Sequence, residues 1–135
     1  MSKTKKIVSI VASITAAIIM LQTLYFKFTA APESVYIFST LGMEPYGRIG
    51  IGIGELIASI LILIPATSWL GAMIAIGLMG GALFFHVTKL GIVVMDDGGQ
   101  LFIYALLVLI CSGVVALINI RKIPLVNRYV NQNTF

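Results

Sequence analysis

Four long apolar runs, separated by segments that carry nearly all of the charged residues, constrain the fold of this chain more than any other feature. A helix needs about 20 apolar residues to cross a bilayer, and residues 7–26 contain no charged residue. Each run is therefore expected to be a spanning helix. The sequence therefore predicts an all-α membrane protein. We expect one domain, residues 1–135, with a four-transmembrane-helix bundle whose spans lie near residues 7–27, 46–64, 68–87 and 100–121.

The first run follows a basic start with Lys3, Lys5 and Lys6. A secretory signal peptide shares this pattern, but its apolar part is usually shorter, about 7–15 residues. We therefore expect an uncleaved first span.

The connection between the first two spans carries helix signals of its own. Pro32 suits a first helical turn. Val35, Phe38 and Leu41 recur every three residues, and Gly42 supplies a stop signal. The pattern predicts a short amphipathic helix, either at the membrane surface or over the mouth of the bundle. An irregular loop is the alternative.

The second and third spans are joined by a short turn that begins at Pro65. Pro65 stops one helix, and Thr67 or Ser68 is expected to cap the next. So short a connection predicts that the two spans are antiparallel neighbours.

These two spans also repeat one glycine spacing. Gly50 and Gly54 in the second span are four residues apart, as are Gly77 and Gly81 in the third. Small residues at this spacing allow helices in a membrane to approach closely. We expect the two helices to cross through these glycines.

The connection before the fourth span contains Asp96 and Asp97, followed by two glycines. Acidic residues beside glycine suggest calcium, but the spaced oxygen ligands of a twelve-residue calcium loop are missing. A turn with an N-cap for the fourth helix explains the same residues.

Composition and cysteine usage limit the function classes. The chain is 59% hydrophobic and only 10% charged, with a net charge of +4. We expect its basic residues to orient the spans and to contact lipid headgroups. No nucleic-acid partner is expected. Cys111 is the single cysteine, which excludes an intrachain dithiol mechanism. With one histidine in a different half of the bilayer, no zinc site is predicted. No catalytic residue can be assigned from spacing.

Basic residues are distributed unevenly between the two ends of the predicted bundle. The end with the termini holds Lys3, Lys5, Lys6, Arg121, Lys122 and Arg128, whereas the other end holds Lys27, Arg48, Lys89 and all the loop acids. By the positive-inside rule, both termini are expected in the cytoplasm.

Polar residues within or beside the spans also gather at one end, the outer end in this topology. Gln22 and Lys27 close the first span, and Arg48 opens the second. His86 ends the third span, and Gln100 begins the fourth. The sequence predicts a polar site in the outer half of the bundle, although span ends are in general polar.

Glu55 is the acid that this general tendency does not explain. It lies seven residues after Arg48, roughly 10 Å deeper along the helix. A charged side chain at membrane depth is costly and usually marks a function or a buried pair. We expect His86 or Lys27, from a second helix, to supply its nearest partner. A purely structural pin and a ligand or proton site both remain open.

Three segments resemble a known family. They are YFKF near the end of the first span, LGMEPYGRIGIGIGELIASILILIP through the second, and MGGALFFHVTKLG at the end of the third. Together they resemble the DoxX-like family of small bacterial integral membrane proteins. The resemblance implies a four-helix bundle in the bacterial cytoplasmic (inner) membrane and a loose link to quinone and redox chemistry.

With this resemblance, the leading hypothesis is a redox-linked accessory that binds a small quinone-like molecule in an outward-facing polar pocket, without autonomous catalysis. Its ligand-binding residues would be Glu55, Arg48, His86, Lys27, Gln22, Gln100, Tyr25 and Tyr104, with Phe85 beside the ring. The alternative is a non-catalytic subunit or scaffold for a partner membrane protein or a second copy of the chain. A proton or solute pathway is disfavoured, because the inner half offers no polar continuation.

Overall fold

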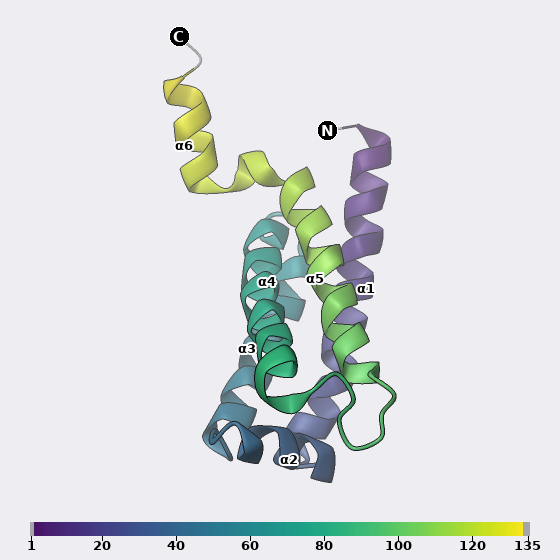
Figure 1. Ribbon diagram of the computed structural model, residues 1–135. Helices are drawn as coiled ribbons and strands as arrows, with labels where there is room; N and C mark the ends of the chain where they lie inside the picture. Colours follow the sequence, from purple (N-terminus) through teal and green to yellow (C-terminus); the bar gives the residue numbers. More distant parts are fainter. Residues whose placement is uncertain (1, 134–135) are drawn as a thin grey trace.

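The computed structural model describes residues 2–133 (Figure 1). Met1, Thr134 and Phe135, at the ends of the predicted domain, lie outside the described residues. The structure confirms the all-α fold class. Four long helices are apolar enough to cross a membrane. The elements in chain order are α1 (Lys3–Phe28), α2 (Pro32–Thr40), α3 (Tyr46–Leu63), α4 (Ser68–Phe85), the π-helical turn η1 (His86–Leu90), α5 (Gln100–Ile118), the 3₁₀ turn η2 (Ile120–Lys122) and α6 (Pro124–Gln132).

The two largest differences from the predicted helix ends have local reasons. The first helix begins before the apolar run, because Ser2 caps it by accepting a hydrogen bond from the backbone N–H of Lys5. The fourth ends at Ile118 rather than residue 121, and the side chain of Asn119 donates back to the Val115 carbonyl, 2.8 Å away.

The segment after the fourth span contains a helix that the sequence analysis did not predict. Pro124 occupies the first turn of α6, where its missing N–H costs nothing. Leu125 and Tyr129, four residues apart, are both exposed. Figure 1 shows α6 projecting away from the bundle beyond α5.

The long helices form a ring in which α1 packs on α3, α3 on α4, α4 on α5, and α5 on α1. Small side chains fill much of the shared core. Its fully buried members include Ala16, Ala58, Ala72, Ala75, Val108 and Val115. Small side chains allow the helices to approach one another, as is usual in membrane bundles.

The close contact between α3 and α4 is real, but the prediction that it runs through Gly50, Gly54, Gly77 and Gly81 is wrong. The glycine at the contact is Gly71. A Cβ there would lie 2.3 Å from the backbone nitrogen of Ile62 and 2.8 Å from the carbonyl oxygen of Ala58. At Gly50, Gly77 and Gly81 a Cβ would meet nothing within 4 Å, and at Gly54 only Leu78 at 3.4 Å.

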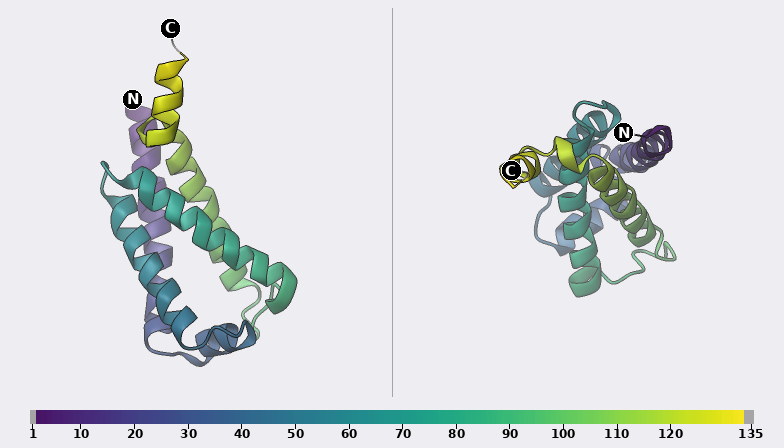
Figure 2. Two further views of the ribbon diagram at one scale, coloured as in Figure 1. Left: turned by 90° about the vertical axis from the view of Figure 1, so that its left-hand side faces the viewer. Right: turned by 90° about the horizontal axis from the view of Figure 1, so that it is seen from above.

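The reason is that α3 and α4 meet at their connecting turn and diverge from it. Figure 2 shows them joined at one end and spread apart toward α2 at the other. The turn also corrects the predicted cap. The hydroxyls of Thr67 and Ser68 donate to the carbonyls of Leu61 and Pro65 and do not cap the N-terminus of α4.

α2 is the predicted short helix, and the structure shows which of its two predicted positions, the membrane surface or the mouth of the bundle, it occupies. It lies across the mouth of the bundle, in the gap between the diverging helices (Figures 1 and 2). Phe38 is buried, and Leu41 ends the helix. Gly42 follows with a φ of 71°, a left-handed conformation that glycine adopts without strain.

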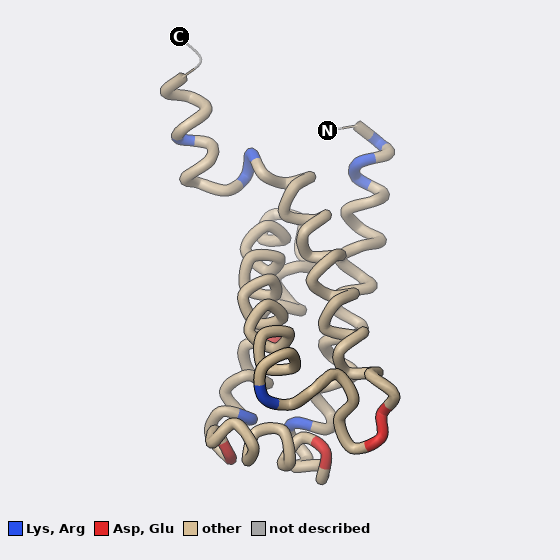
Figure 3. Tube along the Cα trace, viewed as in Figure 1, with Lys and Arg blue, Asp and Glu red and all other residues tan. Residues whose placement is uncertain are grey.

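Charge distinguishes the two ends of the bundle. Both described ends of the chain lie at the same end of the bundle, where the charged residues in Figure 3 are all basic. The opposite end carries the loop acids together with Lys27, Arg48 and Lys89. This is the distribution that the sequence predicted.

Candidate functional site

A cavity of about 330 Å³ lies where the long helices diverge, at the end opposite the termini. α2 forms one wall through Ser34, Ile37 and Phe38. The long helices contribute apolar side chains to the other walls, among them Ile19, Met20, Phe26, Ile51, Leu78, Met79, Phe85, Ala105 and Val108. The polar side chains that reach this cavity are Gln22, Thr23, Lys27, Glu33, Ser34, Glu55, His86, Gln100 and Tyr104. An apolar chamber with few converging polar groups is typical of a small-molecule site.

Lys27 from α1 and Glu55 from α3 form an ion pair at one side of this cavity. Lys27 Nζ lies 3.2 Å from Glu55 Oε2, and the Glu55 side chain is only 5% exposed. The structure therefore brings Glu55 to Lys27, one of the two partners that the sequence predicted. Because the positive partner comes from a different helix, the pair also fixes the α1–α3 contact.

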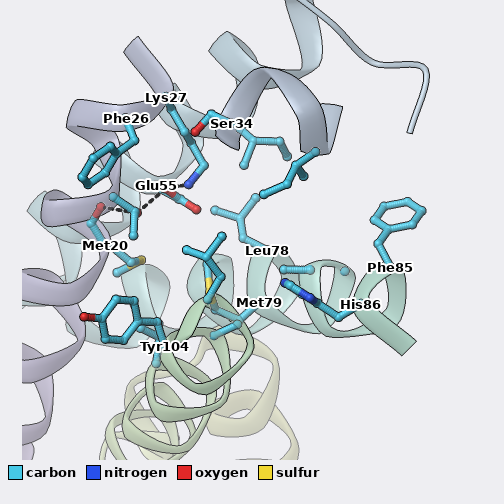
Figure 4. Close-up of a pocket in the computed structure, with 18 of the residues that line it drawn as sticks. Met20, Phe26, Lys27, Ser34, Glu55, Leu78, Met79, Phe85, His86 and Tyr104 are labelled. Atoms are coloured by element: carbon cyan, nitrogen blue, oxygen red, sulfur yellow. Dashed lines mark hydrogen bonds and ion pairs between the residues drawn. The ribbon is translucent and has the colours of Figure 1, made fainter. Parts of the chain in front are cut away.

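Thr23 also lies near this carboxylate. Its hydroxyl is 2.8 Å from the carbonyl oxygen of Met20 and 3.4 Å from Glu55 Oε2. A single hydroxyl hydrogen goes to the nearer acceptor, so Lys27 is the principal partner of Glu55. Both contacts to Glu55 involve Oε2, which leaves Oε1 available to a ligand. Figure 4 shows Glu55 between Lys27 and Leu78 at the edge of the cavity.

His86 is the first residue of η1, where the backbone leaves the regular α4 helix. Its Nδ1 lies 2.9 Å from the carbonyl oxygen of Gly91. Because a carbonyl oxygen only accepts, a neutral His86 carries its hydrogen on Nδ1 and retains a lone pair on Nε2. The ring is 5% exposed and packs edge-on against Phe102, with 5.7 Å between ring centres. His86 thus lines the cavity but makes no ion pair with Glu55 within residues 2–133.

Gln100 and Tyr104 form a polar edge on α5. Gln100 Nε2 donates to the Tyr104 hydroxyl over 2.7 Å, and both residues line the cavity. Gln22 reaches the same cavity from α1 and is largely exposed. These three predicted residues therefore share one cavity with Glu55 and Lys27.

The structure does not bring two of the predicted residues to the cavity. Arg48 is buried, but its guanidinium pairs with Glu44 at 2.9 Å and donates to the carbonyl oxygen of Lys27. It joins the start of α3 to the end of α1 and does not reach Glu55. Tyr25 is 68% exposed and packs on Phe26, facing away from the cavity.

Asp97 organises the turn before α5, which the sequence predicted, whereas the N-cap residue of that helix is Gly99. Its carboxylate accepts hydrogen bonds from the backbone N–H groups of Val94, Gly99 and Leu101, at 3.0, 2.8 and 3.2 Å. Burial alone would raise the pKa of Asp97, but these three donors and the charge of His86 outweigh it and lower the pKa.

Within residues 2–133, no group of three or more His, Cys, Asp or Glu side chains is close enough to hold a metal ion.

The contribution of α2 to the cavity was not predicted from the sequence. Ser34 and Glu33 line it, and burial, followed by the nearby charge of Asp97, raises the pKa of Glu33. The helical spacing of Ser34, Phe38 and Leu41 along one face was the signal that could have identified this wall.

No protein-family model, no curated protein and no solved structure matches the chain.

Proposed function

We propose that this chain is a DoxX-like membrane protein that binds a small, quinone-like molecule in the cavity beside Lys27 and Glu55. The observation that carries the proposal is a mainly apolar chamber of about 330 Å³ with an ion pair from two helices at its side. Pockets for small molecules have this composition, with a few polar groups that fix orientation. The redox link comes from the family resemblance, and the proposed role is accessory binding rather than autonomous catalysis.

The polar groups suit a ring that carries carbonyl or hydroxyl oxygens. Lys27 Nζ is a donor and can bind a carbonyl oxygen. Glu55 Oε1 and His86 Nε2 are acceptors and can bind a hydroxyl hydrogen. The oxidised form of a quinone offers carbonyl oxygens and the reduced form offers hydroxyls, so one set of side chains can hold both. The apolar walls, including Phe85 and Met79, would surround the ring.

The proposal is tested by extracting the full chain in mild detergent and measuring co-extracted quinone by mass spectrometry. Gly77 lines the cavity, and a side chain there meets no atom within 4 Å of its Cβ. Gly77→Leu should therefore fill the cavity without a clash and remove the quinone. Gly50→Leu is the matched control, because Gly50 is an equally open helix glycine outside the cavity. Equal quinone retention in the two variants would contradict the proposal.

The variant Glu55→Gln distinguishes a ligand-binding role of Glu55 from a purely structural one. Glutamine keeps most hydrogen bonds but cannot exchange a proton. If Glu55 serves the ligand, the variant should fold normally and lose the pH dependence of binding a short-chain quinone, measured between about pH 5 and 8. Unchanged binding at every pH, together with a lower melting temperature, would leave Glu55 as a structural residue only.

A scaffold function is the second candidate, and two exposed glycines favour it. Gly50 on α3 and Gly80 on α4 are exposed, with nothing within 4 Å of their Cβ positions, so a partner helix could approach them closely. Under this function, Gly50→Leu would release a co-purifying membrane protein, Gly77→Leu would not, and only bulk lipid would be co-extracted.

A further inference from the structure

A second cavity, of about 410 Å³, lies at the end of the bundle that holds the termini. It is formed by the first half of α1, the α3–α4 turn and the segment that follows α5. Its lining residues are Lys6, Ser9, Ile10, Ser13, Ile14, Ile62, Leu63, Pro65, Ser68, Asn119 and Lys122. None of them lines the cavity beside Lys27 and Glu55.

The α1 wall of this cavity is a single helical stripe. Lys6, Ser9, Ile10, Ser13 and Ile14 follow the spacing that places residues on one helix face. Ser9 and Ser13 are buried, whereas Ile10 and Ile14 are 51% and 45% exposed. The wall therefore offers hydroxyls toward the interior and an apolar surface beside them, toward lipid.

A buried hydrogen bond leaves a donor in the cavity. Asn119 Nδ2 donates to Ser9 Oγ over 3.0 Å, and Asn119 is only 4% exposed. Because Ser9 accepts this bond, its own hydroxyl hydrogen remains available to an acceptor oxygen of a ligand.

Two lysines flank the cavity, and no acid neutralises them from its walls. Lys122 extends back over the α3–α4 turn, where its Nζ donates to the Pro65 carbonyl oxygen at 3.2 Å. Lys6 reaches the cavity from α1. All five acidic residues of the chain belong to the α2–α3 segment, to Glu55 within the bundle, or to the loop before α5. Figure 3 shows that the charged residues at the end with the termini are all basic.

We infer that this cavity binds the phosphate group of an anionic phospholipid. Lys6 and Lys122 supply positive charge, and Ser9 supplies a hydrogen-bond donor to the phosphate oxygens. The acyl chains lie against the exposed side chains of Ile10, Ile14 and Leu63. Basic pockets between transmembrane helices recognise anionic headgroups in this way.

The test uses the full chain in detergent and native mass spectrometry with dioleoylphosphatidylglycerol and, separately, dioleoylphosphatidylcholine. The double variant Lys6→Gln/Lys122→Gln should bind phosphatidylglycerol on the order of 30-fold more weakly, since each lysine near an anionic headgroup contributes roughly fivefold. Lys3→Gln/Arg128→Gln is the matched control, because it removes the same charge from the same end at residues outside the cavity. It should bind like the parent protein.

Ser13→Leu tests the cavity itself without a change of charge. The leucine side chain would occupy the space beside Ser9, so phosphatidylglycerol binding should fall while Lys6 and Lys122 remain. Equal weakening in the two double variants would overturn the inference in favour of diffuse surface charge, as would equal binding of the two lipids. Inorganic phosphate that binds as tightly as phosphatidylglycerol would also overturn it, since the apolar wall would then contribute nothing.

Discussion

Lys27 Nζ lies 3.2 Å from Glu55 Oε2, and this contact joins the end of α1 to the middle of α3. Neither residue has an alternative partner of opposite charge within residues 2–133. The stability of the α1–α3 contact therefore depends on both members of the pair.

Lys27→Met should lower the free energy of unfolding by about 3 kcal/mol, because it leaves a buried carboxylate without its cation. Lys27→Met/Glu55→Leu should recover most of that loss, since no uncompensated charge remains. Denaturant unfolding in detergent measures both variants. Lys89→Met removes an exposed lysine and is the control. Equal stability of the Lys27 and Lys89 variants would contradict a stabilising pair.

Gly71→Ala should destabilise the chain by about 1–3 kcal/mol, the usual cost of overpacking. Its Cβ would lie 2.3 Å from the Ile62 nitrogen, so α3 and α4 must separate at the turn. Gly77→Ala meets no atom within 4 Å and should be neutral or stabilising by up to about 1 kcal/mol, through helix propensity. Thermal unfolding of the two variants side by side gives the comparison, and a reversed order would refute the close contact at Gly71.

Arg48→Lys should cost about 1–2 kcal/mol, although it conserves charge. The guanidinium binds the Glu44 carboxylate and the Lys27 carbonyl oxygen together, and a lysine ammonium cannot reproduce that fork. Arg121→Lys, at an exposed residue after α5, is the control and should have no effect on the unfolding midpoint.

Asp97→Ala should reduce stability by about 1 kcal/mol at neutral pH, because the hydrogen bonds from the backbone N–H groups of Val94, Gly99 and Leu101 to the carboxylate are lost. The folded protein lowers the pKa of Asp97, so the stabilising charge is fully present above the ordinary aspartate pKa of about 3.9. This stabilisation is lost as the pH falls through the lowered pKa, because the unfolded state binds the proton at a higher pH than the folded state does. The stability difference between parent and variant should shrink in that acid range. Asp96→Ala is the matched control, and a pH-independent difference would exclude the carboxylate as its source.

The expected topology places both termini in the cytoplasm. A Cys111→Ala background removes the native thiol, and cysteines are then introduced at Lys3 or Ile92, which are exposed at opposite ends of the bundle. An impermeant thiol reagent added to intact cells should label only the Ile92→Cys variant. Equal labelling of both would refute this topology.

The sequence predicted either Lys27 or His86 as the partner of Glu55, because a carboxylate at membrane depth needs a cation from a neighbouring helix. The structure shows that the partner is Lys27. The sequence did not allow the helix crossing to be placed. Glycine spacing shows where helices can approach closely, whereas the position of contact depends on how the pair is joined. The short turn at Pro65 brings α3 and α4 together at Gly71, and the predicted glycines lie farther along the diverging helices.

Helix geometry explains the two predicted site residues that lie elsewhere. Tyr25 precedes Lys27 by two positions, about 200° around a helix, so the two side chains face different directions. Arg48 shares a face with Glu55, but side chains in a helix lean toward its N-terminus, and that direction brings the guanidinium to Glu44. A separation counted in residues could not reveal this direction.

The spread of α3 and α4 has a consequence for how any ligand would reach the cavity between them. Phe26 on α1 and Gly77 on α4 are exposed residues of its walls, and both belong to helices that are apolar enough to cross a membrane. In a bilayer, the chamber would therefore open toward the lipid tails. A hydrophobic molecule would dissolve in the bilayer before it met the protein. Its occupancy would then follow its mole fraction among the lipids, and diluting the surrounding buffer would leave the site filled.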